Sequence, residues 1–177
     1  MRSPKALLIW LVVIAVGAAV AQMFQQWRAP PAQPPKPTGG VIAGRARAVD
    51  GDSLIVGLAR IRLFGIDAPE GRQPCRDAQR RSYACGEEAR RALAAAIGNR
   101  PVACTPVGLS HDRSVALCTV EGRDLSEAMV RSGHALELRQ HSQGRYAAAE
   151  REARNAKRGL WAGDFDQPAE WRRKDMR

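Results

Sequence analysis

Four acidic residues and one arginine fall within two short segments, Asp50-Gly51-Asp52-Ser53 and Arg62 to Glu70. Hard divalent cations prefer oxygen ligands, and a phosphodiester under attack needs positive charge on its non-bridging oxygens and a base for the attacking water. The residues that supply these groups are Asp52, Asp67, Glu70 and Arg62. The pattern indicates a metal-assisted phosphate site, and a surface hairpin with solvated charges is the alternative explanation of the same spacing.

Two short strands are expected to position these side chains. Val41 to Val49 alternates loosely between apolar and basic residues, and Asp50-Gly51-Asp52 is typical of a turn that leaves a strand, because glycine permits a positive φ. Arg60 and Arg62 alternate with Ile61 and Leu63, which predicts a second strand. Successive side chains of a strand point to opposite faces, so Arg62 should face away from Leu63.

The chain resembles the staphylococcal nuclease (thermonuclease) family from about residue 41 to residue 161. The resemblance rests on five blocks in the family's order, namely Val49-Asp50-Gly51-Asp52-Ser53, Arg62 to Glu70, Asp112-Arg113-Ser114-Val115-Ala116, Leu125 to Gly133 and Gly159-Leu160-Trp161. It implies an α+β fold, in which three helices pack on a five-stranded β-barrel of the oligonucleotide-binding (OB) type. It also implies a calcium-dependent phosphodiesterase, an endonuclease that hydrolyses DNA and RNA.

The resemblance assigns three calcium ligands, a general base and two phosphate-binding arginines. In that order, these are Asp52, Asp67 and Ala68 through its backbone carbonyl, then Glu70, then Arg62 and Arg113. The loop before Arg113 is about three residues shorter than is common in the family and lacks its tyrosine, which packs on bound nucleotide. A later tyrosine-containing loop is replaced by Leu138-Arg139-Gln140-His141. These departures affect nucleotide preference more than the chemistry.

A different class of function, a non-catalytic barrel module that binds nucleic acid or another partner, is the alternative. In such a module the acidic residues would be vestigial. Acids kept among like charges are costly unless a cation or a substrate binds them, so a vestigial site should have lost at least one member. Asp52, Asp67, Glu70 and Arg62 are all retained, which favours the enzyme.

The first 40 residues do not resemble a globular domain. Ala6 to Phe24 is an uncharged, apolar run that follows Arg2 and Lys5, and it contains the small-residue pattern Ala19-Val20-Ala21. We expect residues 1–28 to be a membrane anchor or a cleaved signal peptide that places the domain outside the cytoplasm. Residues 29–40 are rich in proline and predict a stiff linker.

The folded domain is expected to span residues 41–163, followed by a basic C-terminal tail at residues 164–177. The whole chain carries a net charge of +10, with a pI near 10.5, which favours a polyanionic partner such as DNA or RNA. Solubility or association with anionic lipid would explain the same charge, and the basic cluster of the tail could be merely solvated. We expect the domain to be monomeric.

Four cysteines in a small exported domain predict two disulfides. Cys104 and Cys118 lie on two strands of an expected hairpin whose turn contains His111, and directly opposed strand residues are within disulfide range. Cys75 and Cys85 would then close the irregular segment after Glu70. A zinc site is disfavoured, because the chain has no Cys-x-x-Cys pair and no histidine between Cys75 and Cys85.

Three helices are predicted from composition and periodicity. The first runs from Gly86 to Ile97 and ends at Gly98-Asn99. The second is capped by Asp124, with Glu127 as the acid of a capping box. The third spans about Arg145 to Arg158.

Overall fold

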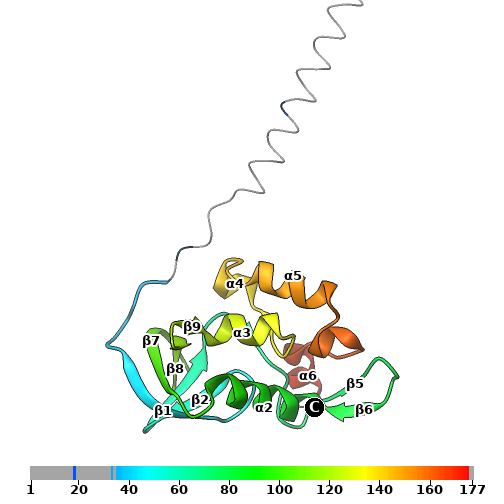
Figure 1. Ribbon diagram of the computed structural model, residues 1–177, viewed down its shortest axis with the longest axis horizontal. Coiled ribbons are helices and arrows are strands. Elements are labelled where there is room, and N and C mark those ends of the chain that lie inside the picture. Colours follow the sequence, from blue (N-terminus) through cyan, green and yellow to red (C-terminus); the bar gives the residue numbers. More distant parts are fainter. Residues whose placement is uncertain (1–17, 19–32, 34, 176–177) are drawn as a thin grey trace, which may run out of the picture. The chain divides into compact units, whose positions relative to one another are not determined.

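The β-strands close into a small barrel (Figure 1). The computed structural model describes residue 18, residue 33 and residues 35–175. The barrel strands are β1 (Ile42–Ala48), β2 (Ser53–Val56), β3 (Ala59–Leu63), β7 (Pro101–Ser110) and β8 (Arg113–Val120). They lie in the order β3-β2-β1-β7-β8, and a parallel pairing of β3 with β8 closes the ring. The predicted five-stranded barrel of the OB type is therefore confirmed.

Short strands extend the barrel. The two-residue strand β9 (Arg123–Asp124) pairs with β8, and β4 (Ile66–Asp67) pairs with β10 (Leu136–Glu137). A separate small hairpin consists of β5 (Pro74–Arg76) and β6 (Ser82–Ala84). The β4–β10 pair fixes the backbone of Asp67, and the β5–β6 hairpin follows the Glu70 turn directly.

The predicted helices are present, and others accompany them. They are α2 (Cys85–Ile97), α3 (Leu125–Arg131), α4 (Arg139–Ser142), α5 (Ala147–Asn155), the 3-10 helix η1 (Gly159–Ala162) and α6 (Pro168–Asp175). Helix α2 packs beside β1 and α3, while α3 packs against β8 and α5. The core is formed by apolar side chains of the barrel and of these helices, among them Leu54, Ile61, Leu93, Val102 and Met129.

Two helix predictions need correction. The third helix runs from Ala147 to Asn155 and is shorter than residues 145–158, because Tyr146 adopts a non-helical cap conformation before it and Lys157 has a positive φ angle after it. The Asp124 side chain caps α3 as predicted, accepting a hydrogen bond of 3.2 Å from the Glu127 backbone N–H. The Glu127 carboxylate, however, pairs with Arg131 on the next turn, so only half of the capping box forms.

Both predicted disulfides form, and they pair all four cysteines of the chain. Cys104 and Cys118 lie directly opposite each other in the β7–β8 hairpin, whose turn contains His111. The second disulfide joins Cys75 to Cys85, so it ties β5 to the first residue of α2. This second link fastens the segment that follows Glu70 to the longest helix among the described residues.

The predicted anchor or signal peptide at residues 1–28 lies outside the described residues, apart from Ala18. Within the described ranges, no helix has the length and apolar character that crossing a bilayer requires. The end of the proline-rich linker contacts the barrel, because the Thr38 backbone N–H donates a hydrogen bond of 2.8 Å to the Pro106 carbonyl on β7.

Candidate active site

A polar cleft of about 500 Å³ opens beside β2 and β3. The turn after β1, the residues after β4, the tip of the β7–β8 hairpin and α6 all contribute to its lining. The lining residues that the sequence singled out are Asp52, Arg62, Asp67, Ala68, Glu70 and Arg113. The structure thus brings together every predicted site residue, although these lie as far apart in the chain as positions 52 and 113.

Asp52 is held in a buried turn. Its carboxylate accepts hydrogen bonds from the Ser53 hydroxyl at 3.0 Å and from the Ala68 backbone N–H at 3.1 Å. The Asp50 carboxylate accepts a hydrogen bond from the Asp52 backbone N–H and so supports the turn. A Cβ atom at Gly51 would lie 2.6 Å from the Cβ atom of Ala68, so the close packing of this turn requires glycine.

Arg62 joins the two aspartates. Its Nη2 atom lies 2.9 Å from an oxygen of Asp52 and 2.9 Å from an oxygen of Asp67, and only 17% of its side chain is exposed. Arg62 pairs with Ser53 across β2 and β3, which places it next to the Asp52 turn. Charged pairs with this little solvent are much less screened than surface pairs. Both carboxylates are thus locked in place by one guanidinium group.

Glu70 lies on a turn that is stabilised by hydrogen bonds to Gln73. Gln73 was not singled out from the sequence. The buried Gln73 side chain accepts a hydrogen bond from the Glu70 backbone N–H at 3.2 Å, and its amide donates to the Asp166 carbonyl at 2.7 Å. The Gln73 backbone N–H donates to the Glu70 carbonyl at 2.8 Å. Because Gln73 supports the turn by both backbone and side chain, Glu70 projects from a defined position.

The Glu70 turn also packs tightly on the start of α2. A Cβ atom at Gly86 would lie 1.7 Å from the Glu70 carbonyl oxygen, so any side chain there would push the turn away. The adjacent Cys85 carries the disulfide to Cys75. A glycine contact and a covalent bond together keep the turn beside the helix.

Arg113, at the first position of β8, approaches the cleft from the opposite hairpin. Its Nη1 atom donates a hydrogen bond of 3.2 Å to the Ser53 hydroxyl, which itself donates to Asp52. The preceding acid, Asp112, pairs with Arg60 at 3.1 Å on the outer surface, where 65% of its side chain is exposed. The shortened loop therefore still delivers Arg113 to the cleft, while Asp112 is engaged elsewhere.

The structure adds a residue that sequence analysis placed in a basic tail. Arg172 on α6 donates hydrogen bonds from Nη1 to Asp67 at 3.0 Å and to Glu70 at 2.7 Å, and from Nη2 to Asp67 at 2.9 Å. Residues 168–175 form a helix, and only 37% of the Arg172 side chain is exposed. More than 100 residues separate these partners in the chain, and no local spacing in the sequence signals such a contact.

The donor set fits a hard divalent cation. Asp52 and Asp67 present buried carboxylate oxygens, and in the structure the guanidinium groups of Arg62 and Arg172 supply the positive charge beside them. Over residues 35–175, no group of three or more His, Cys, Asp or Glu side chains is placed to hold a metal ion. A cation at these aspartates would therefore complete its shell with a backbone carbonyl, as predicted for Ala68, and with water, both common ligands of calcium.

Burial raises the pKa of Asp52 from 3.8 to about 7, the nearby charge of Arg62 opposes the rise, and Asp50 and Asp67 add to it. The folded metal-free protein therefore holds a proton on Asp52 at pH values where the unfolded chain has released it. Its contribution to stability is greatest below the unfolded pKa and is lost as pH rises from about 4 to about 7. Ionised Asp52 therefore lowers the stability of the metal-free protein, and a bound cation would offset this loss.

Asp52→Asn should stabilise the metal-free protein at neutral pH, because the amide carries no charge to bury. Each pKa unit corresponds to about 1.4 kcal/mol, and lost hydrogen bonds offset part of the gain, so we expect an increase on the order of 1–2 kcal/mol at pH 7.5. Urea unfolding in the presence of a chelator, from pH 4.5 to 7.5, measures it. The difference from wild type should grow with pH; a difference independent of pH, or equal to that of the exposed control Asp112→Asn, would contradict this assignment.

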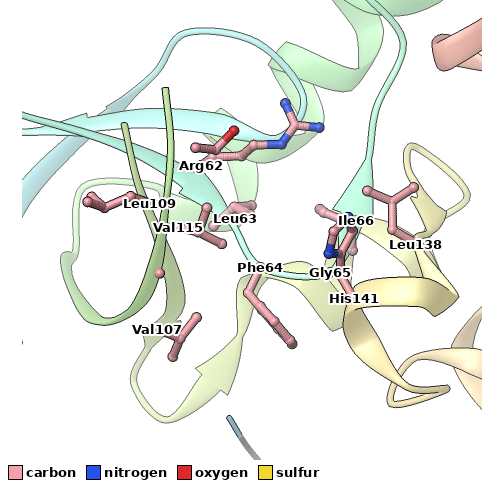
Figure 2. A pocket seen from close by; sticks show the side chains of 12 residues that line it. Arg62, Leu63, Phe64, Gly65, Ile66, Val107, Leu109, Val115, Leu138 and His141 are labelled. Carbon is pink, nitrogen blue, oxygen red and sulfur yellow. The ribbon is translucent and has the colours of Figure 1, made fainter. Parts of the chain in front are cut away.

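An apolar hollow of about 300 Å³ adjoins the cleft, with Arg62 in both linings (Figure 2). Val107, Leu109 and Val115 come from the β7–β8 hairpin, while Leu138 and His141 come from the segment around α4. Figure 2 shows the two groups on opposite sides of Phe64. The hollow is therefore lined mainly by aliphatic side chains, with a phenylalanine and a histidine.

Comparison with known proteins gives a family match over most of this domain. The family model described as staphylococcal nuclease homologue matches residues 60–163. Succinoglycan biosynthesis protein ExoI of Rhizobium meliloti (strain 1021) is 32% identical over 149 residues, which cover 82% of this chain and 74% of that protein. Probable staphylococcal-like nuclease CAN2 of Oryza sativa subsp. japonica is 35% identical over 125 residues, covering 69% of this chain and 31% of that protein. Protein ParB of Escherichia coli is 33% identical over 147 residues, which cover 72% of this chain and 76% of that protein.

Proposed function

The chain belongs to the family of staphylococcal nuclease homologues, and from this premise we propose that it is a calcium-dependent endonuclease that hydrolyses phosphodiester bonds of DNA and RNA. One observation carries the proposal: buried carboxylates, a carboxylate on a fixed turn and two arginines line the same cleft. Staphylococcal-like nucleases among the relatives support the same class of reaction.

Asp52, Asp67 and the Ala68 carbonyl would hold the calcium ion. When bound, the ion supplies positive charge to a phosphoryl oxygen. Hydrogen bonds and Arg62 fix the positions of the two carboxylates before an ion binds. The buried Asp52 would lose its proton in exchange for the cation.

Glu70 would act as the general base. Its carboxylate projects into the cleft from the turn that Gln73 supports, where it would orient a water molecule and take its proton. Arg62 and Arg113 would donate hydrogen bonds to the remaining phosphoryl oxygens, on which negative charge increases as phosphorus becomes five-coordinate. The planar guanidinium fork matches two oxygens at once, which a lysine cannot do.

The surroundings of the cleft suit a nucleic acid. The hollow beside Arg62 offers apolar surface to a sugar or a base next to the scissile phosphate (Figure 2). The net charge of +10 favours encounter with a polyanion. We infer a chain that acts as a monomer, since all six site residues come from one copy.

Cleavage of single-stranded DNA, double-stranded DNA and RNA by the purified chain tests this function. Products are expected with calcium, none with excess chelator, and again after calcium is restored. Binding of the same nucleic acids without cleavage under any of these conditions would instead support the non-catalytic barrel module.

We also propose that the domain acts outside the cytoplasm, tethered through Ala6 to Phe24. The paired cysteines support an oxidising compartment. Membrane fractionation with N-terminal sequencing tests the tether: a membrane-bound chain with its first residues intact is expected. A soluble mature chain that starts at Gln22 would remove the tether and leave export intact, and a cytoplasmic chain would contradict both.

A further inference from the structure

Helix α6 places a guanidinium group on the two carboxylates that the proposed reaction needs free. Arg172 makes hydrogen bonds of 2.9 and 3.0 Å to both oxygens of Asp67, and one of 2.7 Å to Glu70. Asp67 is the proposed metal ligand and Glu70 the proposed base. The Arg172 guanidinium group therefore binds the carboxylate oxygens that the cation and the attacking water would contact in the proposed reaction.

The rest of α6 is held weakly. Of its residues only Pro168 is buried, and Trp171 is partly buried. Its other ion pairs are exposed: Lys174 with Asp166 at 2.9 Å and Arg72 with Asp175 at 3.8 Å. Exposed pairs of this kind contribute little to stability. The contact of Arg172 with the site is therefore the principal polar attachment of α6 among the residues described.

We propose that α6 is an autoinhibitory element, in which Arg172 neutralises Asp67 and Glu70 in the metal-free enzyme and must withdraw before calcium and the attacking water can use them. The inference rests on the proposed function. Helix α6 lies beyond residues 60–163, the range of the family match, so this control belongs to a segment outside that match. Calcium and α6 then bind to the same carboxylates in competition.

If Arg172 and calcium compete for the same carboxylates, removing the Arg172 guanidinium group should increase the affinity for calcium. A site that is open in one molecule in ten binds its ligand about tenfold more weakly than a permanently open site. Arg172→Gln should therefore bind calcium more tightly than wild type, by about tenfold for a site that is open in one molecule in ten. Arg172→Lys, which keeps one charge without the forked geometry, should fall between them.

Calorimetric titration of the full-length protein with calcium chloride, without nucleic acid, is the test. Arg173→Gln is the matched control, because Arg173 is exposed on the same helix and has no ion pair with any described residue. It should bind calcium as wild type does. Asp67→Asn tests whether calcium binds at the proposed site, and it should bind calcium much more weakly than wild type.

Equal or weaker calcium binding by Arg172→Gln, with Asp67→Asn impaired, would overturn the autoinhibition and leave the proposed function standing. Failure of every variant to bind calcium would overturn both. A second readout is hydrogen exchange of the α6 amides in wild type, which should become faster on saturation with calcium. The cleavage rate at saturating calcium tests one further alternative. A rate about a hundredfold lower in Arg172→Gln than in wild type would identify Arg172 as a phosphate-binding residue and contradict the proposal.

Discussion

Glu70→Gln is expected to lower the single-turnover rate of oligonucleotide cleavage by about 10²- to 10⁴-fold at saturating calcium. The amide cannot accept the proton of the attacking water, but it keeps the size of the side chain. The turn should survive, because Gln73 and Gly86 hold the backbone of Glu70 rather than its carboxylate. Calcium binding is expected to change little.

Two acid-to-amide variants are the controls for Glu70→Gln. Glu121→Gln alters an exposed glutamate outside the cleft, and Asp112→Asn alters the exposed acid that pairs with Arg60. Both should cleave at nearly the wild-type rate. A Glu70→Gln enzyme as fast as these controls would mean that Glu70 is not the base.

Arg62→Lys should reduce turnover by about a hundredfold or more, because lysine replaces a planar fork by one point charge. Arg62 bridges Asp52 and Asp67 in the structure, so its loss affects both the developing charge on phosphate and the placement of the carboxylates. Arg113→Lys should have a similar effect, since Arg113 reaches the cleft through Ser53. Single-turnover cleavage measures both.

Arg60→Lys is the matched control for these arginines, because Arg60 lies on the same strand and 63% of its side chain is exposed. It should retain wild-type activity, and circular dichroism should show that all three variants fold. Full activity in Arg62→Lys would contradict the mechanism. Full activity in Arg113→Lys alone would mean that the gap before Arg113 assigns the wrong arginine.

The parts of the fold that were predictable depend on local patterns. Asp124 caps a helix through a neighbour three residues away, and α2 ends where Gly98 adopts a positive φ. The Cys104–Cys118 pair follows from the register of one hairpin. The roles of the carboxylates and arginines were predicted from the family resemblance. Their contacts join strands that are far apart in the sequence, and the periodicity of apolar residues does not predict such contacts.

The parts that were missed depend on tertiary contacts. Gln73 looks like an ordinary polar residue, yet it is buried and joins the Glu70 turn to Asp166. Arg172 lies in a run of basic residues that composition assigns to a solvated tail, and only the fold brings it to Asp67. The short helix α4 and the parallel closure of β3 on β8 likewise have no local signature in the chain.

The central claim, calcium-dependent hydrolysis by this cleft, is tested most directly by one two-by-two comparison. Cleavage of a short labelled oligonucleotide is followed under single-turnover conditions for wild type and Glu70→Gln, each with saturating calcium and with excess chelator. The account predicts rapid cleavage by wild type with calcium alone, and at most about a hundredth of that rate in the other three conditions. Undiminished cleavage by wild type in chelator, or by Glu70→Gln in calcium, would contradict it.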